Sequence, residues 1–372
     1  MVEPFRAMDV LAAANAKMAG GADVVSLAVG QPSAPAPLAV REAAASAVRA
    51  GRLGYTDALG RAELRAAIAR HYGEHYGVDL SPGRVVVTTG SSAGFALAFL
   101  AMFEPGDRIA IERPGYPAYR NICRVMGLDV VEVPVLDGAT VARLAGEGLR
   151  GVLVASPANP TGTVMDPERM DGLIDACAIH GVRLISDEIY HRLTYGGVAD
   201  RTALSRSDDA VVINSFSKYY CMTGWRIGWM VVPETLVRPI ERVAQSLYIS
   251  APDASQIGAV HAFGADDELE AVRRGYAANR EAMLGALPAL GFRVAARSDG
   301  AFYAWVDVSG LTDDSMAFSR AMLDEALVAA PPGHDFDPEE GHRTMRLSYA
   351  GSGEDVARAL DRLGRWLGGW LG

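Results

Sequence analysis

The sequence predicts an α/β protein with a large domain, built on a mostly parallel β-sheet, and a second, smaller α+β domain. The prediction rests on the chain length of 372 residues, on short apolar runs that alternate with helical stretches, and on a change of pattern after about residue 275. A chain of this length exceeds a usual domain of about 100–200 residues. We therefore expect a large domain at 33–275 and a small domain formed by 1–32 and 276–372.

The large domain is predicted from a repeated rhythm of strand and helix. Its expected strands are short and rich in β-branched residues, and they lie at 85–88, 108–111, 129–133, 151–154, 183–186 and 211–214. Strands this uniformly apolar are buried on both faces, as in a parallel sheet covered by helices. Such a sheet places its chemistry at the carboxyl ends of its strands, so the segments that follow them hold the candidate residues.

The small domain is predicted from a different order of elements. A long helix after about residue 275 precedes an apolar run at 300–306, and another helix precedes a second run at 344–349. Between them, Pro331-Pro332-Gly333 and the acidic stretch from Asp335 to Glu340 predict a mobile surface loop.

Composition and charge narrow the possible partners. Half of the residues are hydrophobic, but no run approaches the roughly 18 apolar residues of a membrane-spanning helix, so we expect no membrane anchor. The formal net charge of −10 argues against nucleic acid, which binds through clustered Lys and Arg. The three cysteines, Cys123, Cys177 and Cys221, form no C-x-x-C pair, which favours the reducing cytoplasm and neither a disulfide framework nor a cysteine zinc site.

A lysine and an arginine follow the last expected strand of the sheet. Lys218 ends the run Ser215-Phe216-Ser217-Lys218, directly after strand 211–214. A partly desolvated lysine is nucleophilic and can form a Schiff base with a carbonyl cofactor, although a lone lysine is more often an ordinary surface residue. Arg226 follows in Gly224-Trp225-Arg226-Ile227-Gly228, and its planar guanidinium is suited to a phosphate.

A carboxylate and a phenol follow the strand at 183–186, in Asp187-Glu188-Ile189-Tyr190. A carboxylate at this sheet edge can keep a pyridine nitrogen protonated, and the phenol can bind a ring oxygen. Taken alone, an aspartate at such a position is more often a helix cap.

Two turns after other strands offer groups for a cofactor. The turn Ser156-Pro157-Ala158-Asn159-Pro160-Thr161-Gly162 projects the Asn159 amide. The turn Thr89-Gly90-Ser91-Ser92-Ala93-Gly94 opens a helix and offers N–H groups and hydroxyls to an anion, although a plain tight turn is the alternative.

Together these motifs resemble those of the class I/II aminotransferases, a family of fold type I that depends on pyridoxal 5'-phosphate (PLP). The run from Ser215 to Gly228 is similar to the PLP-lysine motif of that family. The other similar segments follow in the family's order, at 27–32, 159–162, 187–190 and 346–350, so the likeness spans about residues 25–351.

The resemblance implies a role for each motif residue. Lys218 would carry PLP as a Schiff base and shuttle the proton, Asp187 would pair with the pyridine nitrogen, and Tyr190 with Asn159 would bind the ring oxygen. The stacking residue would be Tyr116. The phosphate would be held by Gly90, Ser91, Ser92, Ser215, Ser217 and Arg226, with Tyr55 from the second subunit of a homodimer. The substrate would be bound by Gly30, Asn159 and Arg346, the last of which would clamp its α-carboxylate.

The reaction implied by the resemblance is transfer of an amino group from an L-amino acid to a 2-oxo acid, through an aldimine at Lys218 and a quinonoid intermediate. A PLP-dependent lyase, racemase or cyclising synthase would use the same residues. A PLP-binding protein without turnover is a more remote alternative.

The substrate side chain would meet scattered positions such as Phe5, Tyr55, Tyr248 and Tyr303. No clear second arginine for a distal carboxylate is evident, although Arg113, Arg120 and Arg242 cannot be placed from sequence, so dicarboxylic donors stay open as an alternative. A neutral or apolar amino donor is therefore favoured.

Two further motifs are rejected. His71-Tyr72-Gly73-Glu74-His75 matches an inverted zinc-peptidase pattern, but Gly73 weakens the helix and no third ligand is evident, so we expect a solvated helix face that ends near Tyr76-Gly77. The Gly-rich run 146–151 precedes a strand, whereas a dinucleotide site must follow one, so a loop is expected.

Overall fold

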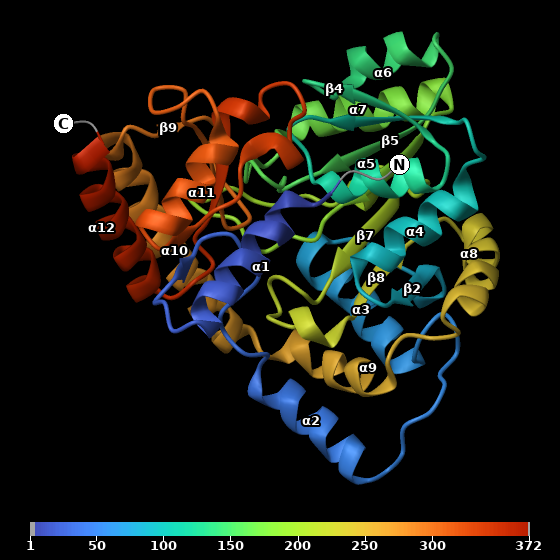
Figure 1. The fold of residues 1–372 in the computed structure, drawn as a ribbon. Coiled ribbons are helices and arrows are strands. Elements are labelled where there is room, and N and C mark those ends of the chain that lie inside the picture. Colours follow the sequence, from blue (N-terminus) through green and yellow to red (C-terminus); the bar gives the residue numbers. More distant parts are fainter. Residues whose placement is uncertain (1–3, 371–372) are drawn as a thin grey trace.

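The structure is a computed structural model that describes residues 4–370 (Figure 1). The ends of the predicted small domain, residues 1–3 and 371–372, lie outside the described residues. A seven-stranded sheet with its covering helices forms one lobe, and the C-terminal helices and short strands form the other. In Figure 1, α12 (Gly353–Trp370) and α8 (Glu234–Leu247) lie at opposite sides of the molecule.

The large sheet has the strand order β2-β8-β7-β6-β5-β3-β4. Its strands are β2 (Val85–Thr88), β3 (Arg108–Glu112), β4 (Asp129–Val133), β5 (Leu149–Ala155), β6 (Arg183–Asp187), β7 (Val211–Ser215) and β8 (Gly228–Val231). All neighbours are parallel except β8, which runs antiparallel to β2 and β7. The prediction of a mostly parallel sheet is confirmed.

The sheet separates two hydrophobic cores, because successive side chains of a strand point to opposite faces. Val152 and Val154 of β5 belong to one core, whereas Leu153 between them belongs to the other. In the same way, Val212 and Ile213 of β7 lie in different cores. Burial on both faces explains why these strands are continuous apolar runs rather than alternating ones.

Helices cover both faces of this sheet. They are α2 (Leu38–Arg49), α3 (Ala62–Tyr76), α4 (Ser91–Met102), α5 (Pro117–Val125), α6 (Gly138–Ala145), α7 (Pro167–His180), α8 and α9 (Asp253–Val260). The ends of α3 and α7 are set by Gly77 and Gly181, whose φ angles of 69° and 64° lie in the left-handed region that favours glycine. Helix α2 lies at the lower end of Figure 1 and packs on α9.

The smaller lobe brings the two ends of the described chain together. It contains α1 (Arg6–Ala19), β1 (Val25–Ser26), α10 (Asp266–Ala286), β9 (Arg293–Val294), β10 (Tyr303–Asp307), α11 (Ser315–Glu325), β11 (Val328–Ala329), β12 (Thr344–Ser348) and α12. Strand β1 pairs with β11 in parallel, and β10 lies between β9 and β12 in an antiparallel sheet.

Short 3-10 helices occur in both lobes. They lie at 82–84, 203–205, 223–225, 261–264, 287–290, 333–335 and 341–343.

The segment that follows Pro331 is only in part the surface loop that the sequence predicts, since Pro338 and Glu339 are exposed but the residues before them are largely buried. Phe336 is fully buried, and Asp335 and Asp337 are only 2% and 5% exposed. The acidic side chains accept hydrogen bonds from backbone N–H groups: Asp335 binds those of Arg6 and Ala7, and Asp337 binds that of Glu339. These two carboxylates therefore serve as buried hydrogen-bond acceptors and not as groups solvated by water.

The expected solvated helix face at His71 is also wrong in part. His71 is 8% exposed and stacks on His75 with ring centroids 5.4 Å apart, and burial lowers the pKa of His71 to about 3. His75 contacts Asp200 at 3.3 Å, and α3 ends at Tyr76, as expected. Within residues 4–370, no group of three His, Cys, Asp or Glu side chains could hold a metal ion.

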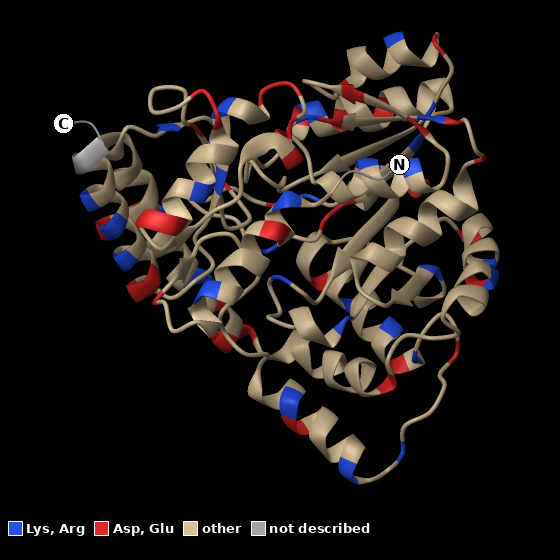
Figure 2. Cartoon of the chain, in the orientation of Figure 1, with Lys and Arg blue, Asp and Glu red and all other residues tan. Residues whose placement is uncertain are grey.

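Charged residues of both signs lie over the outside of the protein, whereas the cysteines lie inside it. Lys and Arg are interspersed with Asp and Glu over the helices seen in Figure 2. Cys123, Cys177 and Cys221 are buried and free. No helix in the described part of the chain is both long and apolar enough to cross a membrane.

Candidate active site

Lys218 lies just beyond the carboxyl end of β7 and faces the small lobe. Its Nζ donates a hydrogen bond of 2.6 Å to the carbonyl of Gly30. The rings of Tyr190 and Phe302 lie 5.8 and 5.9 Å from the same nitrogen. Burial, together with the positive charges of Arg346 and Arg226, lowers the pKa of Lys218 to about 8. A lysine in this environment is uncharged more often than an exposed one, which makes it a better nucleophile.

Asp187 is the last residue of the neighbouring strand β6 and is 3% exposed. The Tyr119 phenol donates a hydrogen bond to its Oδ2, and the Ile189 N–H donates one of 3.0 Å to its Oδ1. Burial raises the pKa of Asp187 to about 6, while these two hydrogen bonds oppose the rise. A buried carboxylate of this kind is suited to a cationic N–H group that would share its site.

The sequence prediction missed Tyr119. A signal was available, because Tyr119 stands three residues after Tyr116, and positions three apart share one face of a helix. Tyr116 is the residue before α5, and the two rings meet edge to face with centroids 5.4 Å apart. Both phenols line the same cavity as Asp187.

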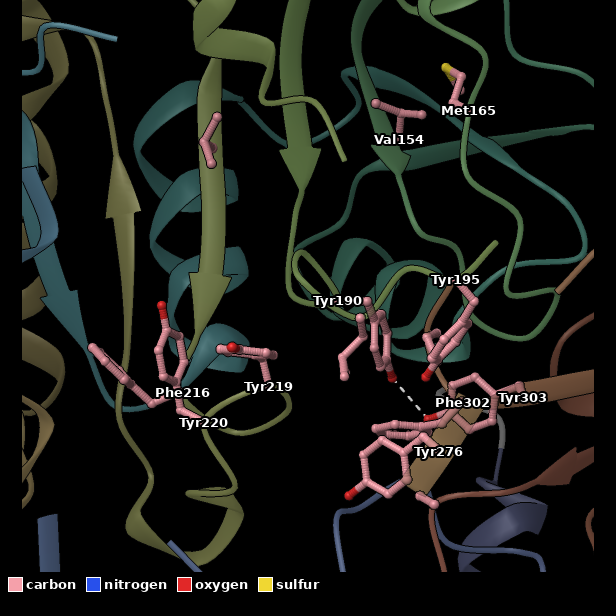
Figure 3. Packing of buried hydrophobic residues seen from close by; sticks show 14 of the residues in the cluster. Val154, Met165, Tyr190, Tyr195, Phe216, Tyr219, Tyr220, Tyr276, Phe302 and Tyr303 are labelled. Atoms are coloured by element: carbon pink, nitrogen blue, oxygen red, sulfur yellow. Dashed lines mark hydrogen bonds between the residues drawn. The ribbon is translucent and has the colours of Figure 1, made fainter. Parts of the chain in front are cut away.

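The hydroxyls of Tyr190 and Tyr303 join the two lobes beside Lys218. They lie 2.8 Å apart, as the dashed line in Figure 3 shows, and both residues are buried. Tyr190 follows β6, whereas Tyr303 begins β10 in the small lobe. A side chain at position 30 would start 1.9 Å from the Tyr303 hydroxyl, so only glycine leaves room here.

An anion cradle lies at the amino end of α4. Gly90 precedes the helix with φ 76°, and a Cβ on it would lie 2.4 Å from the Arg226 guanidinium. The Arg226 guanidinium therefore lies beside Gly90 at the amino end of the helix, and Arg226, Ser91, Ser92 and Ser217 line the same cavity. A helix amino end with a guanidinium above it is a phosphate-binding arrangement.

Ser215, which is predicted to bind the phosphate, lies beside Ser217 in the structure. Its hydroxyl bonds the Ser217 hydroxyl at 2.9 Å and the Ile227 carbonyl at 3.1 Å, and it does not line the cavity. Ser215 therefore supports Ser217 from behind.

Arg346 projects from β12 toward the large lobe and is 4% exposed. Its Nη1 donates to Asn159 Oδ1 at 3.0 Å, and its Nη2 donates to the Ala28 carbonyl at 2.7 Å. The guanidinium carbon lies 4.4 Å from the centre of the Tyr303 ring. Its Nε finds no acceptor among the described residues. A buried guanidinium with an unused donor is suited to an incoming carboxylate.

These groups surround one cavity of about 260 Å³. The sequence-predicted site residues that line it are Gly30, Ser91, Ser92, Tyr116, Asn159, Asp187, Tyr190, Ser217, Lys218, Arg226 and Arg346. Of the four expected side-chain contacts, Phe5 and Tyr303 line it, whereas Tyr55 and Tyr248 do not. Tyr55 is 84% exposed on the segment between α2 and α3. Sequence reasoning missed Met8 and Leu11 of α1, which also line the cavity.

Known proteins resemble this chain over nearly its whole length. The family model "Aminotransferase class I and II" matches residues 22–363. A valine–pyruvate aminotransferase of Mycobacterium tuberculosis is 48% identical, covering 98% of this chain and 97% of the relative. A (5-formylfuran-3-yl)methyl phosphate transaminase of Methanocaldococcus jannaschii is 32% identical, with 98% and 97% covered.

Solved structures agree with these sequence relatives. The crystal structure of an aminotransferase from Mycobacterium tuberculosis superposes with a TM-score of 0.94 at 48% identity, covering 99% of this chain and 97% of the other. The aspartate aminotransferase of Thermus thermophilus with maleate gives a TM-score of 0.92 at 32% identity, with 98% and 97% covered. The predicted fold type I is thereby confirmed.

Proposed function

Because the chain belongs to the aminotransferase class I and II family, we propose that its amino donors are neutral, apolar L-amino acids. The reaction itself is the PLP-dependent transfer of an amino group between an amino acid and a 2-oxo acid. A lyase, a racemase or a cyclising synthase could use similar residues, but the relatives described above are transaminases.

The cavity fits PLP by the chemistry of its groups. A buried lysine amine, a buried carboxylate and an anion cradle open into one space, which matches the aldehyde, the ring nitrogen and the phosphate of PLP. When bound, PLP supplies an electron sink for the carbanion at the substrate α-carbon. We assign its binding to Lys218, Asp187, Tyr190, Asn159, Tyr116, Ser91, Ser92, Ser217 and Arg226, with Gly90 leaving room for the arginine.

Lys218 is assigned the proton transfer at the substrate α-carbon. Its lowered pKa of about 8 provides the neutral amine that accepts a proton, and its Nζ is oriented by the Gly30 carbonyl. Asp187 holds the proton of the ring nitrogen through its carboxylate, whose position is set by Tyr119. Tyr190 is held toward the small lobe by its bond to Tyr303.

Arg346 is assigned to the substrate α-carboxylate, with Asn159 beside it. Its bond to Asn159 fixes the plane of the guanidinium, and the Ala28 carbonyl holds the opposite nitrogen. A planar fork of donors binds a carboxylate with two parallel hydrogen bonds. The amino acid is thereby oriented with its α-carbon near Lys218.

The preference for an apolar donor rests on the cations around the cavity. Among the described residues, those that line it are Lys218, Arg226 and Arg346, and each already has a proposed role. Arg113 pairs with Glu339 and Arg120 with Glu132, and neither lines the cavity, nor does Arg242. No arginine in the described part of the chain is therefore left there for a second substrate carboxylate. The relative at 48% identity is called a valine–pyruvate aminotransferase, which supports the same preference.

The test is a panel of amino donors presented to the PLP form of the protein. Conversion to the pyridoxamine form is followed by absorbance for L-valine, L-leucine, L-alanine, L-aspartate and L-glutamate. We expect the apolar donors to convert the cofactor faster than both dicarboxylic ones. Faster conversion by aspartate or glutamate would contradict the proposed substrate class.

A homodimer with Tyr55 reaching the neighbouring site is part of this proposal. The segment that carries Tyr55 is tied to the large lobe, since Thr56 N–H bonds the Ser250 hydroxyl at 3.3 Å and Gly54 N–H bonds Asp253 at 3.2 Å. The segment exposes Leu53 and Tyr55, and Leu247 and Ile249 are exposed at and just after the end of α8. Light scattering after gel filtration tests the dimer, and weaker PLP binding by Tyr55→Phe tests the shared site.

The cytoplasm is the proposed location. The support is chemical: three buried cysteines remain unpaired, as in a reducing compartment. Fractionation of the producing cells, followed by immunodetection, would test it.

A further inference from the structure

We infer that Asp335 is a positioning residue for substrate selectivity: its carboxylate holds α1 over the cavity, where α1 forms a wall against the substrate side chain. The wall consists of Phe5, Met8 and Leu11, which are called the α1 wall below. The inference rests on the proposed preference for apolar donors and deepens it by naming what reads the side chain.

Asp335 supplies the cap that α1 lacks locally. The first N–H groups of a helix have no partner within the helix, and the preceding side chain usually accepts one of them. That residue is Phe5, which cannot. Instead Asp335 Oδ1 accepts from Arg6 N–H at 3.1 Å and Oδ2 accepts from Ala7 N–H at 2.7 Å. Asp335 is only 2% exposed, so water cannot easily replace its carboxylate as the acceptor.

The same residue is tied firmly to the large lobe. Its backbone carbonyl accepts a bond of 2.8 Å from Arg120 Nη2, and Arg120 Nη1 contacts Glu132 of β4 at 2.8 Å. The next carbonyl, that of Phe336, accepts from Gly115 N–H at 2.9 Å. The position of α1 is therefore set by the large lobe through Asp335, and not only by the small lobe to which α1 belongs.

This anchor also connects the α1 wall to the carboxylate site. The ring centre of Phe336, the residue after Asp335, lies 4.8 Å from the Arg346 guanidinium carbon. One short segment thus supports both Arg346, the proposed carboxylate ligand, and the first turn of α1. A substrate held at Arg346 meets a wall whose distance from Arg346 is fixed by neighbouring residues.

The α1 wall has the chemistry of an apolar side-chain subsite. Phe5, Met8 and Leu11 are spaced three apart, which places them along one side of a helix, and all three line the cavity. The Phe5 ring packs edge to face on Tyr116 with centroids 6.0 Å apart. A branched aliphatic side chain buries more area on such a wall than a methyl group does, so displacement of α1 should affect L-valine more than L-alanine.

The experiment compares kcat/KM for L-valine and L-alanine in the holoenzyme carrying Asp335→Asn or Asp335→Ala. The control is Asp314→Ala: Asp314 caps α11 by accepting from Met316 N–H at 2.9 Å and Ala317 N–H at 3.0 Å, but it does not line the cavity. Asp335→Ala should lower the valine-to-alanine ratio by about 10-fold, mainly through KM for valine. Asp335→Asn should give a smaller change, and Asp314→Ala should leave the ratio unaltered.

A second pair of variants keeps the inference testable if the Asp335 variants fold poorly. Phe5→Ala and Leu11→Ala alter the α1 wall and leave the anchor in place, and they should lower the same ratio. An unchanged ratio in these variants would overturn the inference, as would an equal loss for both donors in Asp335→Ala with unaltered cofactor absorbance. Failure of the proposed function is distinguishable, because it would show in the wild-type donor panel before any variant is measured.

Discussion

The Tyr119 phenol donates a hydrogen bond to the carboxylate of Asp187 inside the protein, between α5 and the end of β6. This bond lowers the pKa of a group that burial raises to about 6. It thus keeps Asp187 ionised down to a lower pH, in the state that binds a protonated ring nitrogen. Tyr119 lies in the first turn of α5 and Asp187 at the end of β6, so the bond depends on how α5 packs against the large sheet.

Tyr119→Phe should weaken PLP binding and shift its pH dependence. Asp187 must lose its proton to attract the cationic ring, so binding by the apoprotein should weaken as the pH falls through about 6. Removing the Tyr119 bond raises the pKa of Asp187, and the weakening should therefore begin at a higher pH. Fluorescence titration of the apoprotein with PLP at several pH values measures both effects. An identical pH profile in the variant would show that the bond does not control the ionisation of Asp187.

Lys218→Ala should abolish the covalent link between protein and cofactor. After reduction with borohydride, mass spectrometry should find PLP on the Lys218 peptide of the wild-type protein and none on the variant. Capture of PLP by the wild-type apoprotein should accelerate as the pH rises through about 8, since the neutral amine is the nucleophile. Reducible cofactor retained by the variant would place the reactive lysine elsewhere.

Asp187→Ala should still admit PLP but lose most turnover, because an unprotonated ring nitrogen is a poor electron sink. Absorbance of bound cofactor and the rate of the half-reaction with L-valine separate the two effects. A near-normal rate would give Asp187 a purely structural role.

Gly90→Ala should damage the anion cradle selectively. The new Cβ would lie 2.4 Å from the Arg226 guanidinium, so the arginine must move away from the amino end of α4. Affinity for PLP should fall by about 10-fold or more, as when a charged hydrogen bond of about 1.5–3 kcal/mol is lost. Affinity for pyridoxal, which lacks the phosphate, should change little. An equal loss for both compounds would indicate general damage to the site.

The strands of the fold could be predicted where a local pattern of apolar residues determines them. The site residues could be predicted where they belong to a short sequence motif. Strand β6 and Asp187 at its end follow from a buried run and the residue after it. The roles of Tyr119 and Asp335 were not predictable in this way. Asp335 bonds Ala7, which is 328 residues away in sequence, and its acidic surroundings suggested a solvated loop. A motif also does not show which hydroxyl faces the cavity: Ser217 lines it, whereas Ser215 bonds the Ser217 hydroxyl and does not.

Arg346→Lys and Arg346→Ala should separate carboxylate binding from the integrity of the fold. A lysine ammonium cannot reproduce a two-pronged contact, so Arg346→Lys should raise KM for L-valine sharply. Loss of one partner of a buried charged contact costs about 2–5 kcal/mol, so Arg346→Ala should weaken the reaction with amino acids roughly 30-fold to several thousand-fold. The variant also leaves the Asn159 oxygen and the Ala28 carbonyl without their donor, so thermal unfolding must be measured alongside. Simple amines without a carboxylate should react almost as with the wild-type protein. Should amines and amino acids lose reactivity equally while PLP stays bound, Arg346 would serve to join the lobes, and the carboxylate would bind elsewhere.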